Sequence, residues 1–309
     1  MSAWFQEQQT PTTQLRVAYE RLLARERSRY QEVALYQTAA FGRVLTLDDV
    51  IMTTEADEFA YHELLVHPAL LACPHPRSVL VVGGGDGGAV REVLRHPEVE
   101  AVTVAELDPV VVRLCRQHLP WAERAFGDRR VHLAFGDASE FVRRQPSGSF
   151  DAVLVDAPDP VGHASVLFSP AFYQDCRRVL RAGGVLAAQS DSPYTMPEVT
   201  RRVFGQLREL FPVVRVCWSV VPTYAGSLWT FTLGSLGEDP ARQPPPERVG
   251  PLLNCRYWTP ELHRAAFILP AFVQRRLLDP HAPHLPHYQG TRAERMRAAK
   301  SSSTAPGMT

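Results

Sequence analysis

The sequence predicts an α/β protein in which a doubly wound sheet follows a small antiparallel β unit. Three observations predict this class. From residue 78 onward, apolar runs of strand length alternate with amphipathic stretches of helix length, as in a parallel sheet covered on both faces. A glycine-rich turn joins the first of these strands to its helix. Before residue 55, short strand-like runs are instead separated by turns.

An N-terminal β-strand domain is expected over residues 1–54. Short strands are predicted at Glu32–Tyr36, Val44–Leu47 and Val50–Met52, because apolar residues recur there with strand spacing and turn residues separate the runs. The preceding segment, Leu15–Arg27, is predicted to be a helix.

A second domain is expected over residues 55–290. Its first helix is predicted over Glu55–Leu71 from the helical spacing of apolar residues, with Thr54 as the N-cap. Residues 234–251 are rich in proline, glycine and charge and are expected to be a surface linker, and residues 291–309 a flexible tail. Strands alternating with helices are predicted at 78–82, 101–106, 131–135, 150–155, 185–189, 213–221 and 228–233.

The glycine-rich turn has the sequence of a nucleotide-binding loop. Gly83, Gly85 and Gly88 satisfy the spacing G-x-G-x-x-G after a strand and before a helix, where glycine lets the backbone approach a ligand closely. Glu106 ends the next strand, where a carboxylate can hold ribose hydroxyls. This arrangement indicates a Rossmann-like sheet, and by itself it fits either a nicotinamide cofactor or an S-adenosyl donor.

Two further acidic residues favour the S-adenosyl donor. Asp86 lies within the turn, where its charge would repel a bound pyrophosphate but attract a cationic donor. Asp137 follows a third strand, at a position suited to an adenine amino group. The sheet is therefore expected to be of the methyltransferase type.

A second acidic cluster follows the strand at 150–155. Asp156 and Asp159 come directly after it, and in a doubly wound sheet the carboxyl ends of the strands form the ligand crevice. Packing these carboxylates beside Asp86 raises their free energy, and a ligand with several positive charges would remove that penalty. Aromatic and amide side chains at the presumed ends of helices and strands also favour an ammonium ligand: Tyr61, His62, Gln189 and Tyr224.

The composition excludes several classes of function. Lys plus Arg and Asp plus Glu both number 33, so the basic excess of a nucleic-acid-binding protein is missing. The five cysteines are far apart and form no CxxC pair, which predicts reduced thiols and no metal site. The N-terminus lacks a signal-peptide pattern, and no stretch is long enough to cross a bilayer, so a cytoplasmic protein without a membrane partner is expected.

In these motifs the sequence resembles the spermidine synthases, or polyamine aminopropyltransferases. The similarity runs from about Gln31 to Leu269 and is most specific in the glycine-rich turn with its aspartate and in the Asp156–Gly162 loop. It implies that Asp86 pairs with the donor's aminopropyl ammonium and that Asp156 is the general base. It implies a thioadenosine site at Gln31, Glu106, Asp137, Ala138 and His163, and an amine pocket at Tyr61, His62, Asp86, Asp156, Asp159, Gln189 and Tyr224.

The resemblance implies an enzyme of polyamine biosynthesis. It would transfer the aminopropyl group of decarboxylated S-adenosylmethionine, a co-substrate, to putrescine, giving spermidine and methylthioadenosine without any metal or other cofactor. It also implies a homodimer or homotetramer built through the N-terminal β unit.

Further functions stay open at this point. The acceptor could be agmatine, cadaverine or spermidine instead of putrescine. An amine N-methyltransferase would need a donor that keeps its carboxylate, which Asp86 would repel. A third hypothesis is a non-catalytic binder of polyamines or adenosine ligands, and a more distant one is a nicotinamide dehydrogenase.

The match to the family is incomplete around the expected amine pocket. His163 stands where the family usually has proline, and Ala157-Pro158 stands where small hydroxyl residues are common. Ala225 follows Tyr224 at a position where proline is usual. The change at His163 lies at a place that contacts the thioadenosine, and the others lie at the rim of the amine pocket, where they bear on which amine is accepted.

Overall fold

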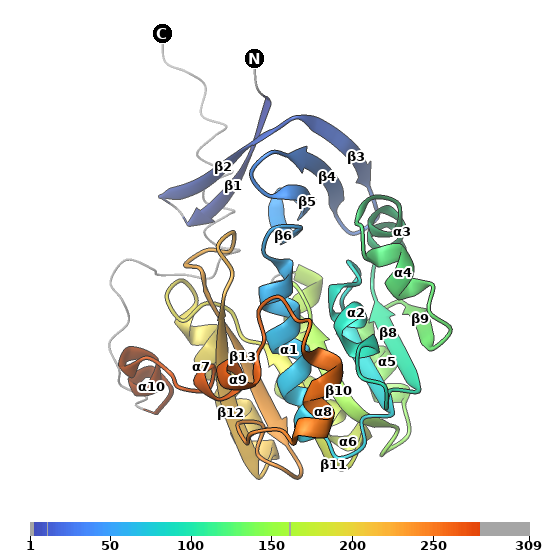
Figure 1. The fold of residues 1–309 in the computed structure, drawn as a ribbon. Coiled ribbons are helices and arrows are strands. Elements are labelled where there is room, and N and C mark those ends of the chain that lie inside the picture. The colour runs from blue at the N-terminus through green and yellow to red at the C-terminus, as the bar shows by residue number, and fades with distance from the viewer. Residues whose placement is uncertain (1–2, 11, 161, 279–309) are drawn as a thin grey trace.

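The computed structural model describes residues 3–10, 12–160 and 162–278, and Figure 1 shows their arrangement. Two antiparallel sheets at the N-terminus are followed by a seven-stranded sheet with helices on both faces. The fold class expected from the sequence is therefore confirmed. The predicted tail at 291–309, and the end of the second predicted domain, lie outside the described residues.

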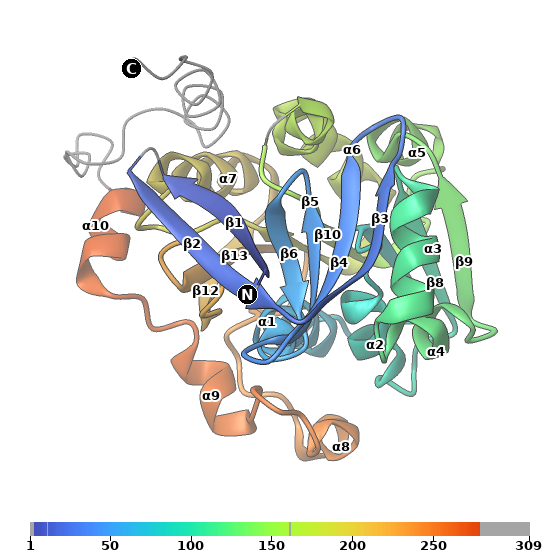
Figure 2. The same ribbon diagram turned by 90° about the horizontal axis from the view of Figure 1, so that it is seen from above.

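Six strands form the N-terminal part. The first two pair with each other, and the next four form a sheet in the order β3-β4-β5-β6. Seen from above, these strands lie over the large sheet (Figure 2). Their bounds are β1 Ala3–Thr10, β2 Thr13–Tyr19, β3 Arg21–Arg27, β4 Glu32–Thr38, β5 Gly42–Leu47 and β6 Val50–Thr54.

The helix predicted over Leu15–Arg27 is wrong, because this segment forms β2 and β3. Most residues of β3 favour helix, but intrinsic preference is at most about 0.7 kcal/mol per ordinary residue, and tertiary contacts override it. Strand β3 pairs with β4 along its whole length. Val17 of β2 is buried in a small core with Phe5 and Tyr36, whose rings stack at 4.8 Å. These partners lie elsewhere in the sequence, where local periodicity does not reveal them.

The large sheet has the strand order β12-β13-β11-β10-β7-β8-β9. Its pairs from β11 to β9 are parallel, whereas β13 runs antiparallel to both of its neighbours. The central strands are mainly apolar because both of their faces are covered. The bounds are β7 Ser78–Gly83, β8 Ala101–Glu106, β9 Val131–Phe135, β10 Phe150–Asp156, β11 Leu180–Gln189, β12 Val213–Val220 and β13 Leu228–Ser235.

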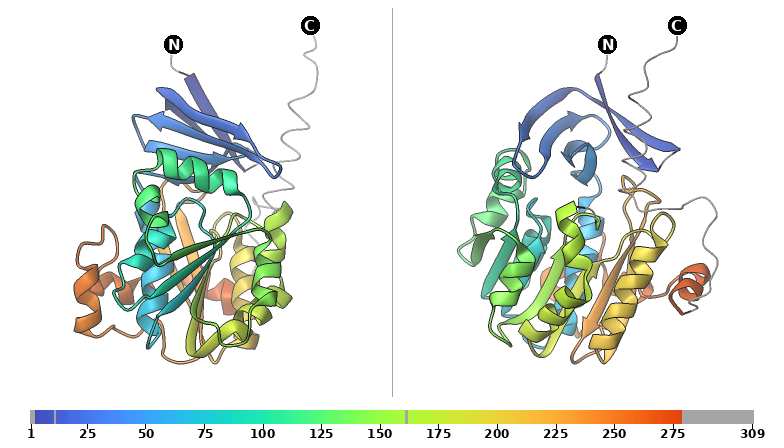
Figure 3. Two further views of the ribbon diagram at one scale, coloured as in Figure 1. Left: turned by 90° about the vertical axis from the view of Figure 1, so that its right-hand side faces the viewer. Right: turned by 180° about the vertical axis from the view of Figure 1, so that it is seen from behind.

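Helices cover the large sheet in two layers, which Figure 3 shows from the side and from behind. One layer holds α1 Glu58–Ala72, α2 Gly88–Leu94, α3 Pro109–His118 and α4 Ala122–Phe126. The other holds α5 Ala138–Arg144, α6 Pro170–Val179 and α7 Pro197–Leu210. The remaining helical segments are η1 Gly162–Phe168, α8 Pro246–Val249, η2 Gly250–Leu252, α9 Pro260–Ala265 and α10 Ala271–Leu278.

Two local predictions need correction. Thr54 is not the N-cap of the first helix, because its backbone ends β6 opposite Val44. The cap position is held by Asp57, whose side chain accepts a hydrogen bond of 2.7 Å from the Thr54 hydroxyl. Residues 234–251 are not merely a surface linker. Arg248 donates hydrogen bonds to carbonyls at the end of α1, which holds this segment against the helix.

The topology places one end of the large sheet beneath the N-terminal strands. Residues at the carboxyl ends of the parallel strands line one cavity together with residues of β1, β5 and β6, so these ends face the N-terminal strands, which lie at the top of Figure 1. Side chains that follow β7, β8, β10 and β11 therefore meet at this edge, together with residues from the N-terminal strands.

Candidate active site

A cavity of about 330 Å³ lies at this edge of the sheet. Its size falls within the range of small-molecule sites. Residues from the N-terminal strands, α1, the strand ends, η1 and the β12–β13 loop line it. All twelve site residues expected from the sequence are among them: Gln31, Tyr61, His62, Asp86, Glu106, Asp137, Ala138, Asp156, Asp159, His163, Gln189 and Tyr224.

The glycine-rich turn needs glycine because the site's own side chains and backbone press against it. A Cβ on Gly83, whose φ is +80°, would lie 2.2 Å from the carbonyl oxygen of Asp156. A Cβ on Gly85 would lie 2.8 Å from the Glu106 carboxylate, and one on Gly88 would lie 2.2 Å from the His62 ring. The turn therefore packs closely against three candidate ligand-binding residues, Asp156 through its backbone and Glu106 and His62 through their side chains.

Asp86 is oriented by the turn that carries it. Its Oδ1 accepts a hydrogen bond of 2.8 Å from the Gly88 amide at the start of α2. Its carbonyl oxygen accepts another, of 2.9 Å, from the Trp121 indole. The second carboxylate oxygen, Oδ2, faces His62 and lies 3.5 Å from the ring nitrogen Nε2.

The charged group at the centre of the cavity consists of Asp86, Asp156 and His62. The Asp156 Oδ2 atom lies 3.9 Å from His62 Nε2. Burial raises the pKa of Asp156 to about 6, an effect that His62 opposes and Asp86 reinforces. Burial would lower the pKa of His62, but Asp86, Glu58 and Asp156 together raise it to about 9. At neutral pH the group therefore holds an imidazolium between two carboxylates.

A second carboxylate, Glu106, lies at the end of β8 on the nucleotide side of the cavity. Burial raises the pKa of Glu106 to about 7, although amide hydrogen bonds, including one of 2.9 Å from Asp108, favour its charged form. Gln31 reaches the same region and donates to Asp108 at 3.1 Å. Asp137 caps α5 by accepting from the Glu140 amide. These polar groups surround a space in which ribose and adenine edges could be bound.

Aromatic side chains line the opposite part of the cavity. Tyr61 makes edge-to-face contacts with Tyr224 at 5.8 Å and with Phe231 at 5.0 Å. The Tyr224 hydroxyl donates to the Met52 carbonyl, which fixes the ring against the N-terminal sheet. The Gln189 amide donates to the Ala157 carbonyl at 3.0 Å and so holds the acidic loop after β10. On the nucleotide side, beside Gln31, His163 contacts Tyr30 edge-on at 5.8 Å.

Sequence reasoning missed several residues of this cavity. Glu7 of β1 is only 2% exposed and lines the cavity, as do Tyr30, Met52 and Trp229. No local signal pointed to Glu7, because residues 3–10 carried no predicted element and reach the site only through the fold. Tyr30 and Met52 lie in or beside predicted strands, but the sequence did not predict which side chains of these strands would face the cavity.

Two groups among the described residues could in principle hold a metal ion. One is His62, Asp86 and Asp156 in the cavity, and the other lies outside it on α1 and α2. An imidazolium has no free lone pair on nitrogen, so the charged form of His62 is not a ligand. Within the described part of the chain, no helix combines the length and apolarity needed to span a membrane.

The fold and the cavity define an α/β protein in which a glycine-rich turn and an acidic cluster meet in one cavity at the carboxyl edge of the sheet. The comparisons with known proteins identify the particular family. The model described as "Spermine/spermidine synthase domain" matches residues 58–240, and "Spermidine synthase tetramerisation domain" matches residues 3–55. The chain belongs to the spermidine synthase family, and it is an aminopropyltransferase, as expected from the sequence.

Individual relatives agree over most of the chain. A polyamine aminopropyltransferase of Moorella thermoacetica is 45% identical over 277 residues, 90% of this chain and 97% of its own. Another polyamine aminopropyltransferase, from a Thermoanaerobacter species, is 42% identical over 89% of this chain and 98% of its own. A spermidine synthase solved with the transition-state analogue AdoDATO has a TM-score of 0.86 and 33% identity, covering 89% of this chain and 94% of its own. The spermidine synthase of Thermotoga maritima has a TM-score of 0.83 and 32% identity, with the same coverage.

Proposed function

We propose that this enzyme transfers the aminopropyl group of decarboxylated S-adenosylmethionine to putrescine. The observation that carries the proposal is the pair Asp86 and Asp156, whose side chains are only 12% and 11% exposed and which share one cavity with the nucleotide-side carboxylate Glu106. A cationic donor and a cationic acceptor would compensate these charges together. A pyrophosphate-bearing cofactor would be repelled by Asp86.

In the proposed reaction the acceptor nitrogen attacks the aminopropyl carbon next to sulfur. A new C–N bond forms, the C–S bond breaks, and its electron pair stays on sulfur, so neutral methylthioadenosine leaves. The acceptor must first lose a proton, because an alkylammonium ion resembling lysine has a pKa of about 10.4 and no lone pair. Asp156 is the proposed general base, since a raised carboxylate pKa brings its proton affinity closer to what this step requires.

The donor would lie along the glycine-rich turn. Glu106 would accept hydrogen bonds from the ribose hydroxyls, and the thioadenosine would lie among Gln31, Asp137, Ala138 and His163. Asp86 would pair with the terminal ammonium of the aminopropyl arm. The remaining catalytic effect comes from holding donor and acceptor in the attacking geometry.

The acceptor would lie on the aromatic side. Tyr61 and Tyr224 offer ring faces to an ammonium group, which such contacts stabilise by about 0.5–2 kcal/mol. A diamine has a second ammonium, and two further carboxylates, Asp159 and Glu7, line the same cavity for it. Gln189 would support the acidic loop from behind. A short diamine such as putrescine satisfies this arrangement with one cation at each end.

The competing functions can be separated by one product assay. The protein is incubated with putrescine and either decarboxylated or ordinary S-adenosylmethionine, and the products are identified by mass. We expect spermidine and methylthioadenosine from the decarboxylated donor only. A methylated amine from the ordinary donor would show an N-methyltransferase, and no product from either donor with putrescine, agmatine, cadaverine or spermidine would favour a non-catalytic binder. A competition assay in which agmatine, cadaverine or spermidine is mixed with putrescine then gives the order of preference among the acceptors.

Donor selection is tested at Asp86. A charge pair at about 4 Å with an effective dielectric near 20 is worth on the order of 4 kcal/mol before desolvation. Asp86→Asn should therefore weaken binding of the decarboxylated donor and narrow its advantage over S-adenosylmethionine, measured by calorimetric titration of both. A mutant that keeps the full preference would contradict this role.

We further propose that the chain forms a homodimer or homotetramer through residues 3–55, since these match a tetramerisation domain. A cytoplasmic location stays a prediction from the sequence. Light scattering of the purified protein gives the oligomer size directly.

A further inference from the structure

A chain of charged side chains runs from the cavity into the helix layer behind it. Within α1, His62 Nδ1 contacts Glu58 Oε2 at 2.7 Å, and both residues are buried. Arg91 of α2 clamps the same carboxylate with two hydrogen bonds of 2.8 and 2.9 Å. The Arg91 Nε atom also donates to Glu92 at 2.6 Å. The two helices are therefore joined by ion pairs that end at the cavity.

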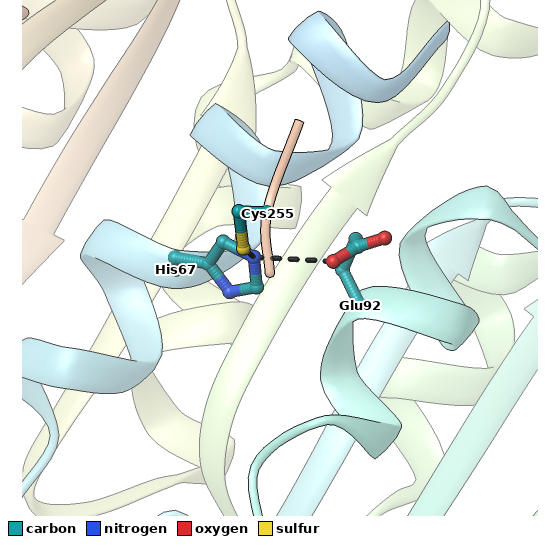
Figure 4. A group of neighbouring side chains, drawn as sticks. All are labelled: His67, Glu92 and Cys255. Carbon is teal, nitrogen blue, oxygen red and sulfur yellow. Dashed lines mark hydrogen bonds and ion pairs between the residues drawn. The ribbon is translucent and has the colours of Figure 1, made fainter. Parts of the chain in front are cut away.

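The end of this ion-pair chain that lies farthest from the cavity is the group His67, Glu92 and Cys255, drawn in Figure 4. His67 Nε2 lies 3.1 Å from Glu92 and 3.2 Å from the Cys255 sulfur. Its other nitrogen lies 3.1 Å from His96. These are metal-ligand atom types, but Arg91 and Arg95 both face the Glu92 carboxylate. A divalent cation would meet their positive charge, so we interpret the group as the anchor of the ion-pair chain.

The end of the ion-pair chain that lies at the cavity determines how the His62 ring is placed. The His62 ring fits only because position 88 is glycine, and its Nε2 points at the two cavity carboxylates. The charged or titratable groups around the ring are Glu58 and Tyr61 on its own helix, Asp86 from the β7–α2 turn and Asp156 from the end of β10. Three of these four neighbours are carboxylates, and Arg91 is the cation that faces Glu58 from α2.

We propose that Glu58 and Arg91 are positioning residues that hold His62 as an imidazolium between Asp86 and Asp156, so that both cavity carboxylates stay ionised before the substrates bind. The proposal rests on the proposed function in taking Asp156 as the base. Glu58 acts through His62, and Arg91 acts through Glu58.

The physical reason is the mutual repulsion of two buried carboxylates. Without a cation between them, burial and repulsion favour a proton on one carboxyl group, and a protonated Asp156 cannot accept the acceptor's proton. The imidazolium removes that penalty. It is itself buried, and it stays charged because Glu58 accepts from its far side. Arg91 keeps Glu58 ionised and aimed at His62, since a bidentate guanidinium fixes the carboxylate plane.

The test compares pH profiles of kcat/KM, which report groups of the free enzyme. In Glu58→Gln the imidazolium loses its carboxylate partner, so His62 becomes neutral and the pKa of Asp156 rises. We expect the acid limb to move to higher pH by about one unit, with activity largely regained at alkaline pH. Arg91→Gln should move it in the same direction, and Arg91→Lys, which keeps the charge, should move it less.

A second measurement does not depend on activity. The ¹⁵N shifts of the His62 ring distinguish imidazolium from imidazole, and we expect imidazolium in the wild type at pH 7 and imidazole in Glu58→Gln. Arg181→Gln is the matched control, because it breaks a 2.9 Å ion pair to a buried carboxylate away from the cavity. Its profile and the His62 signals should match the wild type.

The outcomes separate the inference from the proposed function. If Glu58→Gln loses activity equally at every pH and His62 stays charged, Glu58 is merely structural and the inference is wrong. If the wild type makes no aminopropyl product at all, the proposed function fails, while the ring signals still decide whether Glu58 maintains the imidazolium.

Discussion

Strand β10 carries an aspartate near each end, and the two side chains differ sharply in the groups that surround them. Asp151, near its start, and Asp156, at its end, are similarly buried, with side chains 12% and 11% exposed. Asp151 accepts from the amides of Arg77 and Ser78 at 3.1 and 2.8 Å and from Arg181 at 2.9 Å. Asp156 instead faces Asp86, and the groups that stabilise its charge are His62 at 3.9 Å and a side-chain hydrogen bond from Tyr61.

The comparison indicates that burial alone does not separate a structural carboxylate from a candidate catalytic one, because the groups beside each carboxylate differ. Donors satisfy Asp151, so its charge joins β7, β10 and β11 at the closed end of the sheet. Burial raises the pKa of Asp156, Asp86 adds to that rise, and the side chain faces a cavity. A perturbed acid in a cleft is a candidate for chemistry, whereas a fully hydrogen-bonded one is a candidate for stability.

The largest expected effect separates the two aspartates by activity. Asp156→Asn should lower kcat by about 10²–10⁴-fold, because an amide of the same shape cannot take the acceptor's proton. Asp151→Asn should leave kcat within about twofold, since it lies roughly 16 Å away along the strand. Steady-state rates at saturating substrates check both, and binding of methylthioadenosine shows that the site of Asp156→Asn is intact. Equal activity of Asp156→Asn and wild type would remove Asp156 as the base.

The second prediction concerns stability, for which we expect Asp151 to matter more than Asp156. Asp151→Asn should lower the free energy of unfolding by about 1–3 kcal/mol, because three donors lose a charged acceptor. Asp156→Asn should be neutral or stabilising, since burial, the largest cause of its raised pKa, makes the charged carboxylate costly in the folded state. Urea unfolding of both variants beside the wild type gives the two values. A larger decrease in the free energy of unfolding for Asp156→Asn than for Asp151→Asn would contradict our interpretation.

The third prediction concerns pH. The pKa of Asp156 is raised to about 6, so the base loses its charge as the pH falls through that value. We expect kcat/KM to fall on the acid side of about pH 6, approaching a tenfold loss per pH unit. Because Asp86 and Asp156 interact, the limb reports the apparent pKa of the pair. An acid limb near pH 4, the ordinary range for a carboxyl group, would show that burial and Asp86 do not raise the pKa of Asp156.

The smallest effect is expected at Glu106, the carboxylate that ends β8. Ribose hydroxyls that donate to it favour its charged form, and its pKa in the empty site is about 7. Donor binding at pH 7 should therefore release about half a proton, measured by calorimetry in buffers of different ionisation enthalpy. Glu106→Gln should weaken donor binding roughly fivefold to tenfold and abolish the release. An unchanged dissociation constant would place the ribose elsewhere.

Much of the site could be predicted because it follows from chain order. Asp86, Glu106 and Asp156 each come at or directly after a strand that is apolar enough to recognise from sequence, and parallel strands bring such ends to one edge. The helix predicted at Leu15–Arg27 failed for the opposite reason. Its strands are defined by pairing with β1 and β4, which no local period records.

The sequence by itself determined the doubly wound sheet, the nucleotide-binding turn and the acidic edge, because strand and helix periods and glycine spacing are local properties of the chain. Only the tertiary structure decided which acidic side chains are compensated. Glu7 reaches the cavity from β1, Arg91 clamps Glu58, and Arg181 satisfies Asp151. The energy of a buried charge depends on the groups within a few ångströms of it, and folding brings these groups together from distant parts of the chain.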